Sequence, residues 1–341
     1  MPAPNRFPSA ANGAGFKPLA ELLHRLGLKF GIHMMRGIPR QVVDRNTPIL
    51  GTRYRAQDIA DRASVCPWNT DMVGVDLNKP GAQAYYDSLC RLSASWDVDF
   101  LKADDMSRPY FTHQPEIHAL RSAIDRSGRA MVLSLSPGET PLAAADDVQG
   151  QANMWRISDD FWDKWPLLLE QFVRLAAWAP YQRPGNWPDA DMLPLGLIDL
   201  GRRRTNFTPD EQVTPMTLWC VARSPLIMGG DLRRLDDFTL ALLANDEVLA
   251  VNQASRSNRQ ISRTADEAVW AAEDVRSGET IIALFNLRDA NARVLAPLAA
   301  LGLTGPLRVR DLWRHTMAQV QAAFAPFLPA HGAGLYRISR S

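Results

Sequence analysis

The sequence predicts an α/β protein that ends in a smaller antiparallel β domain. Three observations support this fold class. From about residue 17 to residue 258, short apolar runs rich in β-branched residues alternate with longer amphipathic stretches, as in repeated βα units around a parallel sheet. Near Asn252 helical periodicity stops and alternating segments begin. At roughly 150 residues per domain, 341 residues correspond to two domains, which we place at 1–258 and 259–341.

Short apolar runs predict six strands in the first domain. They lie at 28–33, 99–104, 130–135, 153–157, near 189–192, and at 225–229. Amphipathic stretches predict the helices at 16–26, 83–95, 116–126, 161–178 and 210–223. Each helix is long enough to cover one face of the sheet, whereas residues 2–15 look like a loop.

Four alternating segments predict the strands of an antiparallel β-sandwich in the second domain. They lie at 267–272, 280–285, 307–311 and 334–338. Ser277 and Gly278 stand between the first two segments and have the composition of a hairpin turn.

The charge balance excludes several classes of partner. Lys and Arg number 38 against 37 for Asp and Glu, a formal net charge of +1, so no broad field favours nucleic acid or an anionic membrane surface. Apolar residues make up 46% of the chain, but no apolar run approaches the ~18 to 20 residues of a membrane span. We therefore expect no nucleic-acid or membrane partner, and the oligomeric state stays open.

The cysteines indicate neither a disulfide framework nor a zinc site. Cys66, Cys90 and Cys220 are far apart, with no Cys-x-x-Cys pair, and their number is odd. No His-x-His or similar spacing suggests metal ligands, so we expect no metal and no cofactor. The first residues lack the basic and apolar regions of a signal peptide, and the compartment is unknown.

Charged and hydroxyl side chains collect at the C-terminal ends of the predicted strands, where the βα loops open toward a ligand. They are His33; Lys102, Asp104 and Asp105; Ser134 and Ser136; Arg156, Asp159 and Asp160; Asp189, Asp191 and Asp231. Packing alone does not require carboxylates at consecutive strand ends, so these residues predict a functional site.

Two of these carboxylates suit the cleavage of a glycosidic bond, which needs one ionised and one protonated carboxyl group. Asp104 lies two residues after Lys102 on one strand, so both side chains point the same way and the ammonium favours an ionised Asp104. Asp160 follows Arg156 by four residues, with Trp162 close by. An indole ring can stack on the C–H face of a sugar while charged groups bind its hydroxyls.

Each of these features also has an ordinary structural explanation. Lys102 and Asp104 could form an ion pair inside the barrel, and Asp160 could cap the helix that follows it. For His33, a structural role in the barrel is the better explanation. Asp189 and Asp191 could fix a loop through backbone hydrogen bonds.

Five motifs in order carry a family resemblance. They are 27–32 (GLKFGI), 99–104 (DFLKAD), 155–160 (WRISDD), 184–193 (PGNWPDADML) and 224–232 (SPLIMGGDL). Over about 225 residues this set resembles glycoside hydrolase family 27, the α-galactosidase or melibiase family. The segment 245–253 (NDEVLAVNQ) is similar to that family's junction between barrel and sandwich.

The resemblance implies a (β/α)8 TIM-type barrel followed by a small antiparallel β-sandwich domain. It also implies a retaining exo-glycosidase that hydrolyses terminal α-D-galactosides through a covalent glycosyl-aspartate intermediate. Asp104 matches the family's nucleophile, Asp160 its general acid/base, and Lys102 and Arg156 its sugar-hydroxyl ligands. In a retaining pair, the carboxyl groups of Asp104 and Asp160 should face each other ~5 to 5.5 Å apart.

Because the sequence departs from the family pattern at several positions, it does not determine which sugar is the substrate. Ser136 stands near the position where α-galactosidases commonly have Glu, and a small residue there admits a bulkier 2-substituent. His33 stands where a tyrosine is usual, the segment 36–68 differs in character, and Met106 replaces a family cysteine. We expect Ser136, His33 and Trp162 to contact the substrate as well. The alternatives are an α-N-acetylgalactosaminidase, a β-L-arabinopyranosidase, or an inactive barrel fragment.

The motifs align with strands three to eight of the family barrel, which leaves the first two βα units without a counterpart. On this interpretation, the strands at 28–33 and 225–229 are exposed sheet edges. Apolar side chains such as Phe30, Ile32 and Met228 would then be partly open to solvent, and the chain would tend to self-associate. A strand recruited from 36–75 would contradict this expectation.

Overall fold

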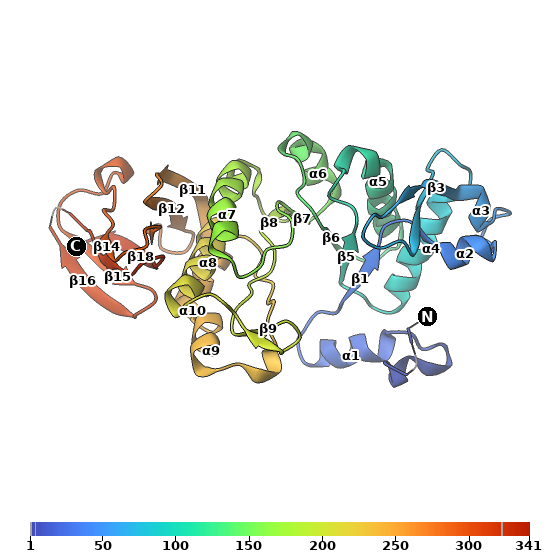
Figure 1. The fold of residues 1–341 in the computed structure, drawn as a ribbon, viewed down its shortest axis with the longest axis horizontal. Helices are drawn as coiled ribbons and strands as arrows, with labels where there is room; N and C mark the ends of the chain where they lie inside the picture. Colours follow the sequence, from blue (N-terminus) through green and yellow to red (C-terminus); the bar gives the residue numbers. More distant parts are fainter. Residues whose placement is uncertain (1, 4, 322) are drawn as a thin grey trace. The chain divides into compact units, whose positions relative to one another are not determined.

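The computed structural model describes residues 2–3, 5–321 and 323–341. The chain divides into two compact units. The first comprises Met1–Asp159 and Arg183–Asn186, and the second Asp160–Gln182 and Trp187–Ser341. Figure 1 colours the chain from blue at the N-terminus to red at the C-terminus.

A parallel sheet forms the centre of the first unit. Its strands are β1 (Gly31–Met35), β5 (Phe100–Asp104), β6 (Val132–Leu135) and β7 (Met154–Arg156), in that spatial order. They lie at four of the predicted positions. His33 is the register partner of Lys102, which in turn is the partner of Ser134, so the predicted polar side chains gather at one end of this sheet.

The helices of the first unit are α1 (Lys17–Arg25), α4 (Ala82–Ser95), α5 (Tyr110–Arg126) and α6 (Ala145–Gln151), with a 3-10 turn η2 (Leu142–Ala144) before α6. In Figure 1, α4 and α5 lie beside the sheet, whereas α1 lies below the strands. In α5, Ile117, Leu120 and Ile124 recur at the spacing of one helix face and are fully buried. The helix begins six residues before the predicted start at 116, at Tyr110, whose side chain is also buried.

Residues 36–75 form a small structure of their own that the sequence did not predict. It is an antiparallel sheet in the order β2 (Ile38–Pro39), β4 (Met72–Val75) and β3 (Ala60–Val65), with the short helices α2 (Arg40–Asp44) and α3 (Ala56–Ile59). In the described part of the chain, this segment adds no strand to the parallel sheet, and β1 pairs only with β5. The first predicted strand is therefore an edge strand here, as expected.

The N-terminal residues correct two of the expectations. The stretch predicted as a loop contains the 3-10 turn η1 (Pro8–Gly13), and the ring of Phe16 contacts those of Phe7, Phe30 and Trp96 at centroid distances of 5.0, 5.7 and 5.4 Å. This aromatic cluster buries Phe30, which is only 7% exposed. The prediction that Phe30 is open to solvent is therefore wrong, whereas Ile32 is half-buried.

The second unit begins with helices and short strands. Its helices are α7 (Trp165–Trp178), α8 (Pro209–Ala222), α9 (Asp237–Leu243) and α10 (Asp246–Ala254), with 3-10 turns η3 (Ala179–Tyr181) and η4 (Leu232–Arg234). Its first strands are β8 (Trp187–Asp189), β9 (Leu197–Ile198) and β10 (Arg203–Arg204). The predicted strand at 225–229 is wrong for the described residues, because Met228 makes only an isolated bridge with Leu193.

Local chemistry explains where two of these helices start. α7 begins four residues later than predicted, after Lys164 as N-cap and with Pro in its first turn, where the missing N–H of proline costs nothing. α8 begins with a capping box in which the Thr208 hydroxyl accepts a hydrogen bond from the Glu211 backbone N–H, and the Glu211 carboxylate accepts one from the Thr208 backbone N–H.

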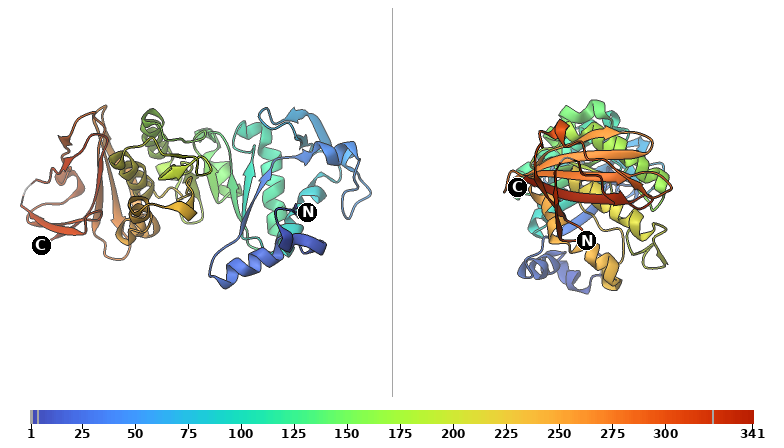
Figure 2. Two further views of the ribbon diagram at one scale, coloured as in Figure 1. Left: turned by 60° about the horizontal axis from the view of Figure 1, so that its bottom comes forward. Right: turned by 90° about the vertical axis from the view of Figure 1, so that its left-hand side faces the viewer.

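The C-terminal part of the second unit is a β-sandwich (orange to red in Figure 2). Its larger sheet has the order β11 (Ser255–Arg263), β12 (Glu267–Asp274), β13 (Thr280–Asn286), β18 (Ala333–Arg340), β15 (Leu307–Asp311) and β16 (Thr316–Val320). β14 (Ala292–Arg293) pairs with β17 (Phe327–Leu328), and η5 (Ala299–Leu301) follows β14. A buried core that includes Ile282, Leu284, Val294 and Leu328 joins the two sheets.

The four predicted sandwich strands and their hairpin turn are confirmed as β12, β13, β15, β18 and the turn between the first two. Gly278 has φ +72° there, and Asp274 Oδ1 accepts hydrogen bonds from the backbone N–H groups of Arg276 and Ser277. Among the described residues, no helix has the length and apolar character needed to span a membrane.

Candidate active site

Strand β5 presents Lys102 and Asp104 on one side. Successive side chains of a strand point to opposite faces, and in β5 the apolar Leu101 and Ala103 are buried while Lys102 and Asp104 are half-buried. The predicted common orientation of Lys102 and Asp104 follows from this alternation. No ion pair joins their side chains among the described contacts, so the interior ion pair considered above is not formed.

Two other side chains hold the carboxylate of Asp104. His33 Nε2 lies 2.8 Å from Asp104 Oδ2, and Ser136 Oγ donates to Asp104 Oδ1 at 2.5 Å. The sheet register explains both contacts. His33 is the register partner of Lys102, and the backbone N–H of Ser136 donates to the carbonyl of Ala103 at 2.9 Å. His33 therefore has a contact to the candidate nucleophile rather than a purely structural role.

The environment of Asp104 keeps its carboxyl group ionised. Burial by itself raises the pKa of this group, but hydrogen bonds from His33 and Ser136 and the charges of His33 and Lys102 outweigh burial, so its pKa lies below the usual value. The side chain is 18% exposed, which leaves it accessible. An ionised, accessible carboxylate is the form that a nucleophile needs.

Behind Asp104 lies a buried ionic cluster that the sequence did not reveal. Asp105 has φ +60° and turns its carboxylate inward, where it accepts from Arg36 Nε at 2.9 Å. Arg36 also donates to Glu116 Oε1 at 2.6 Å, and the Tyr86 hydroxyl donates to Glu116 Oε2 at 2.5 Å. Burial raises the pKa of Glu116 despite these contacts. The cluster ties β5 to α4, α5 and the start of the 36–75 segment.

A buried histidine lies beside this cluster. Burial, and then the charge of Arg36, lower the pKa of His113 to about 4, so its imidazole is neutral at pH 7. Arg36 lies three residues after the predicted strand at 28–33, but nothing in the sequence indicated that it pairs with Glu116, which lies in a predicted helix. The adjacent pair Asp104 and Asp105 was the one available signal, since neighbouring strand residues face opposite sides.

Strand β7 supplies Arg156, which is 2% exposed. One of its terminal nitrogens donates to the carbonyl of Ser158 at 3.1 Å. Asp159, three residues later, accepts two hydrogen bonds from Arg108 at 3.1 and 2.8 Å. Arg156 is thus placed at the same end of the parallel sheet as Asp104, as the sequence predicted.

Asp160 and Trp162 open the second unit. Both are solvent-exposed, Trp162 by 36%. The alternative that Asp160 caps the next helix is wrong, because α7 starts at Trp165 and its N-cap is Lys164. Since Asp104 belongs to the first unit, the expected pairing of the two carboxyl groups stays a prediction.

Asp191 fixes the backbone next to Asp160. Asp191 has φ +78°, and its Oδ2 accepts from the backbone N–H of Phe161 at 2.8 Å. The indole N–H of Trp219 donates to the Asp191 carbonyl at 2.9 Å, and Asp189 Oδ1 accepts from the Asp191 backbone N–H at 2.9 Å. The loop-fixing role considered for Asp189 and Asp191 is therefore the one that the structure shows.

The part of the chain described here offers no group of three or more His, Cys, Asp or Glu side chains arranged to hold a metal ion. Cys66, Cys90 and Cys220 are buried and free. The candidate site consists of carboxylates, basic groups and hydroxyls at the carboxyl ends of parallel strands. An α/β-barrel glycoside hydrolase uses groups of these kinds at this place in the fold.

Comparisons with known proteins agree with this class. The family model described as alpha galactosidase A matches residues 51–254, and the model of the alpha galactosidase C-terminal beta sandwich domain matches residues 264–338. Alpha-galactosidase 2 of Arabidopsis thaliana is 31% identical over 98% of this chain and 74% of its own length. The chain belongs to glycoside hydrolase family 27, and the predicted fold class of an α/β barrel followed by a β-sandwich is confirmed.

Two solved bacterial structures are more similar. A family 27 β-L-arabinopyranosidase from Geobacillus stearothermophilus is 52% identical, with a TM-score of 0.97 over 100% of this chain and 80% of that one. A protein from Bacillus halodurans with a provisional α-N-acetylgalactosaminidase name is 46% identical, with a TM-score of 0.88 over 100% of this chain and 82% of that one. The protein is therefore a glycosidase that acts on a carbohydrate substrate.

Proposed function

We propose that this glycosidase retains configuration, with Asp104 as nucleophile and Asp160 as general acid/base. The observation that supports this assignment most directly is the pair of hydrogen bonds that hold both oxygens of Asp104 and keep it ionised. An ionised carboxylate that is fixed by two hydrogen-bond donors and partly exposed to solvent is suited to nucleophilic attack rather than to proton donation.

In the first step, an Asp104 carboxylate oxygen forms a bond to the anomeric carbon while the glycosidic bond breaks. The proton of Asp160 goes to the departing oxygen. In the second step, Asp160 takes a proton from a water molecule, whose oxygen attacks the anomeric carbon and releases Asp104. Both residues return to their initial protonation states, and the released sugar keeps the anomeric configuration of the substrate.

Three further side chains would bind the sugar. Lys102 and Arg156 bring positive charge to the strand ends and would donate to ring hydroxyls, and the exposed indole of Trp162 offers a stacking surface. We expected Ser136 to contact the substrate directly, but its hydroxyl donates to Asp104. We therefore assign Ser136 the role of holding the nucleophile in place.

For the sugar, we propose a terminal β-L-arabinopyranoside, with α-D-galactosides as second substrate. The support is the similarity over the full chain to the Geobacillus β-L-arabinopyranosidase, at 52% identity. α-D-Galactose has the same arrangement of ring hydroxyls and differs only by the hydroxymethyl group on C5, and the plant relatives are named α-galactosidases. The α-N-acetylgalactosaminide expected from Ser136 is the third substrate to test.

The test compares the nitrophenyl β-L-arabinopyranoside, α-D-galactoside and α-N-acetylgalactosaminide by kcat/KM on one enzyme preparation. We expect the highest value for the arabinopyranoside. Proton NMR of the first-formed sugar should show the anomer of the substrate. A first product of opposite configuration contradicts the retaining mechanism, and a preference for the acetamido sugar contradicts the proposed specificity.

A further inference from the structure

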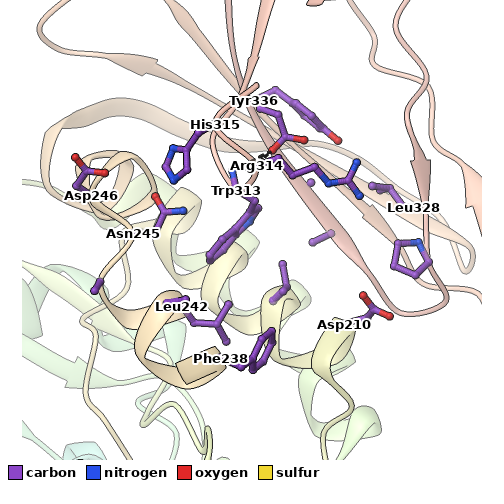
Figure 3. A pocket seen from close by; sticks show the side chains of 17 residues that line it. Asp210, Phe238, Leu242, Asn245, Asp246, Trp313, Arg314, His315, Leu328 and Tyr336 are labelled. Carbon is purple, nitrogen blue, oxygen red and sulfur yellow. Dashed lines mark hydrogen bonds between the residues drawn. The ribbon is translucent and has the colours of Figure 1, made fainter. Parts of the chain in front are cut away.

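The second unit contains a cavity of about 590 Å³ that the catalytic proposal does not use. This volume lies within the ~300 to 1,000 Å³ typical of small-molecule sites. Its wall comes from α8, α9, the start of α10, the turn between β15 and β16, and the strands β17 and β18 (Figure 3). None of the catalytic or sugar-binding candidates lines it.

Aromatic and apolar side chains form one part of the wall. Leu242, Leu328 and Tyr336 are buried, and Phe238 is 39% exposed at the rim. The indole N–H of Trp313 donates to Thr217 Oγ1 at 2.9 Å. This bond fixes the ring of Trp313 in place beside the cavity, so a flat apolar surface is present before any ligand arrives (Figure 3).

Acidic and basic side chains line the same cavity. Asp311 Oδ1 accepts from the backbone N–H groups of Trp313 and Arg314 at 3.0 Å each, and among the described contacts no hydrogen bond is made to its other oxygen. Asp210 and Arg314 are exposed. Among the described contacts, neither side chain has an ion-pair partner. Figure 3 shows the carboxylate of Asp210 and the guanidinium of Arg314 around one hollow with Trp313 and Phe238.

The combination of carboxylates, a guanidinium and aromatic rings indicates which class of ligand fits the cavity. Carboxylates disfavour an anion, and the guanidinium of Arg314 disfavours a cation. Several polar groups would be left unpaired against a purely apolar ligand, at a cost in free energy. A neutral polyhydroxyl compound satisfies all of them, because each hydroxyl both donates and accepts, while the C–H face of a pyranose ring stacks on an aromatic side chain.

We propose that this cavity is a second, non-catalytic carbohydrate-binding site that takes a neutral pyranose unit. It would hold the sugar between Trp313 and Phe238, with hydroxyls bonded to Asp311 and Arg314. The inference rests on the chain being a carbohydrate-acting enzyme and not on the roles assigned to Asp104 and Asp160. Such a site would keep the enzyme on a polymeric or oligomeric substrate between turnovers.

The first experiment labels the ten tryptophans with 5-fluorotryptophan and follows them by fluorine NMR. The Trp313 signal is assigned as the one that disappears in Trp313→Phe. L-Arabinose, D-galactose and N-acetyl-D-galactosamine are titrated separately, with tetramethylammonium chloride as the cationic comparison. At least one sugar should shift the Trp313 signal in a saturable way. A signal that moves with none of the sugars, or only with tetramethylammonium, overturns the proposal.

The second experiment uses Phe238→Ala and Arg314→Ala, which change side chains exposed at the rim. Each should weaken the sugar affinity read at Trp313 roughly tenfold, the effect of one lost hydrogen bond to a charged group or of one lost stacking surface. Phe111→Ala, an exposed aromatic on α5 that is 56% accessible, is the matched control and should change nothing. Thermal unfolding confirms that all three variants fold. An unchanged affinity in both rim variants overturns the proposal.

Activity measurements separate this proposal from the catalytic one. The two rim variants should keep the kcat/KM of nitrophenyl glycosides and show a higher KM on a galactose-substituted mannan. If no glycoside is hydrolysed but the Trp313 signal still titrates with sugar, the proposed mechanism fails and the second site stands. If small glycosides are hydrolysed and Trp313 does not respond, the second site fails alone.

Discussion

At the residue scale, Asp104 combines the features that a glycosidase nucleophile requires. Its two oxygens are each held by a donor, and its pKa lies below the usual value because those donors and nearby charges outweigh burial. Asp104→Ala removes the atom that forms the covalent bond. We expect turnover to fall at least about a thousandfold. Added azide should restore part of the turnover by attacking the sugar ring from the face that Asp104 occupied, which gives a β-glycosyl azide from an α-glycoside.

The control for this variant is Asp125→Ala, which changes a carboxylate that is 66% exposed on α5. It should leave turnover unchanged. The rate is measured with a nitrophenyl glycoside, and the azide product is identified by NMR. Substantial turnover by Asp104→Ala without azide would contradict the assignment.

Ser136→Ala tests whether the hydrogen bond to Asp104 sets its ionisation. The bond stabilises the carboxylate, so its loss should raise the pKa of Asp104. Activity needs the ionised form, and kcat/KM falls as the pH drops through this pKa. The acid limb of the pH profile should therefore move to higher pH, by about one unit for a bond of ~1.5 kcal/mol to a charged group. An acid limb that stays in place would contradict this role.

Asp160→Ala should affect substrates unequally. If Asp160 donates the proton to the departing oxygen, substrates with poor leaving groups lose most activity, whereas activated aryl glycosides lose less. The measurement is kcat/KM for a series of aryl and alkyl glycosides that differ in leaving-group pKa. Equal losses across that series would contradict the acid role.

The sequence predicted a good part of this site. Lys102 and Asp104 share a face because strand side chains alternate, and that rule needs no structure. The contact between His33 and Asp104 depends on the register of β1 with β5, which the spacing along the chain does not determine. The role of Ser136 likewise depends on how β6 continues past its last residue.

At the scale of the elements, the buried cluster of Arg36, Asp105 and Glu116 ties β5 to the helices behind it. Glu116→Ala leaves Arg36 with one buried partner fewer and Tyr86 without an acceptor. We expect the free energy of unfolding to fall by about 3 kcal/mol. Urea unfolding measures this quantity. The surface pair of Arg121 and Asp125, broken by Asp125→Ala, should cost less than about 1 kcal/mol. Equal losses would contradict a structural role for the cluster.

The elements also show where sequence reasoning stops. The four predicted sandwich strands and the helices α4 and α8 lie within two residues of their predicted bounds, whereas α5 starts six residues earlier and α7 four residues later than predicted. The sheet at 36–75 was missed because β2 has two residues and β3 pairs irregularly with β4, so neither has a recognisable period. The run 225–229 is apolar enough for a strand, but apart from one bridge at Met228 it does not pair as one in the described part of the chain.

At the scale of the molecule, the two halves of the second unit depend on each other. The domain boundary that we propose near residue 258 falls within β11. Three contacts cross this boundary. The Thr214 hydroxyl donates to the His331 carbonyl at 2.6 Å. The ring of Trp165 stacks on that of His331 with a centroid distance of 3.8 Å, and the rings of Phe172 and Phe285 lie 4.9 Å apart between centroids. Helix α8 is buried along most of its length, so the β-sandwich covers a surface that cannot face water without cost.

A chain that ends at residue 258 should therefore not fold stably. Ending there cuts β11, removes every strand that pairs with it, and uncovers the apolar side of α7 and α8. We expect this shortened chain to aggregate, or to unfold at least ~10 °C below the full chain, because a newly exposed apolar surface costs several kcal/mol. Thermal unfolding by circular dichroism and sedimentation velocity, with the full chain as control, measure both outcomes. A monomer with the unfolding temperature of the full chain would show instead that residues 1–258 are an autonomous domain.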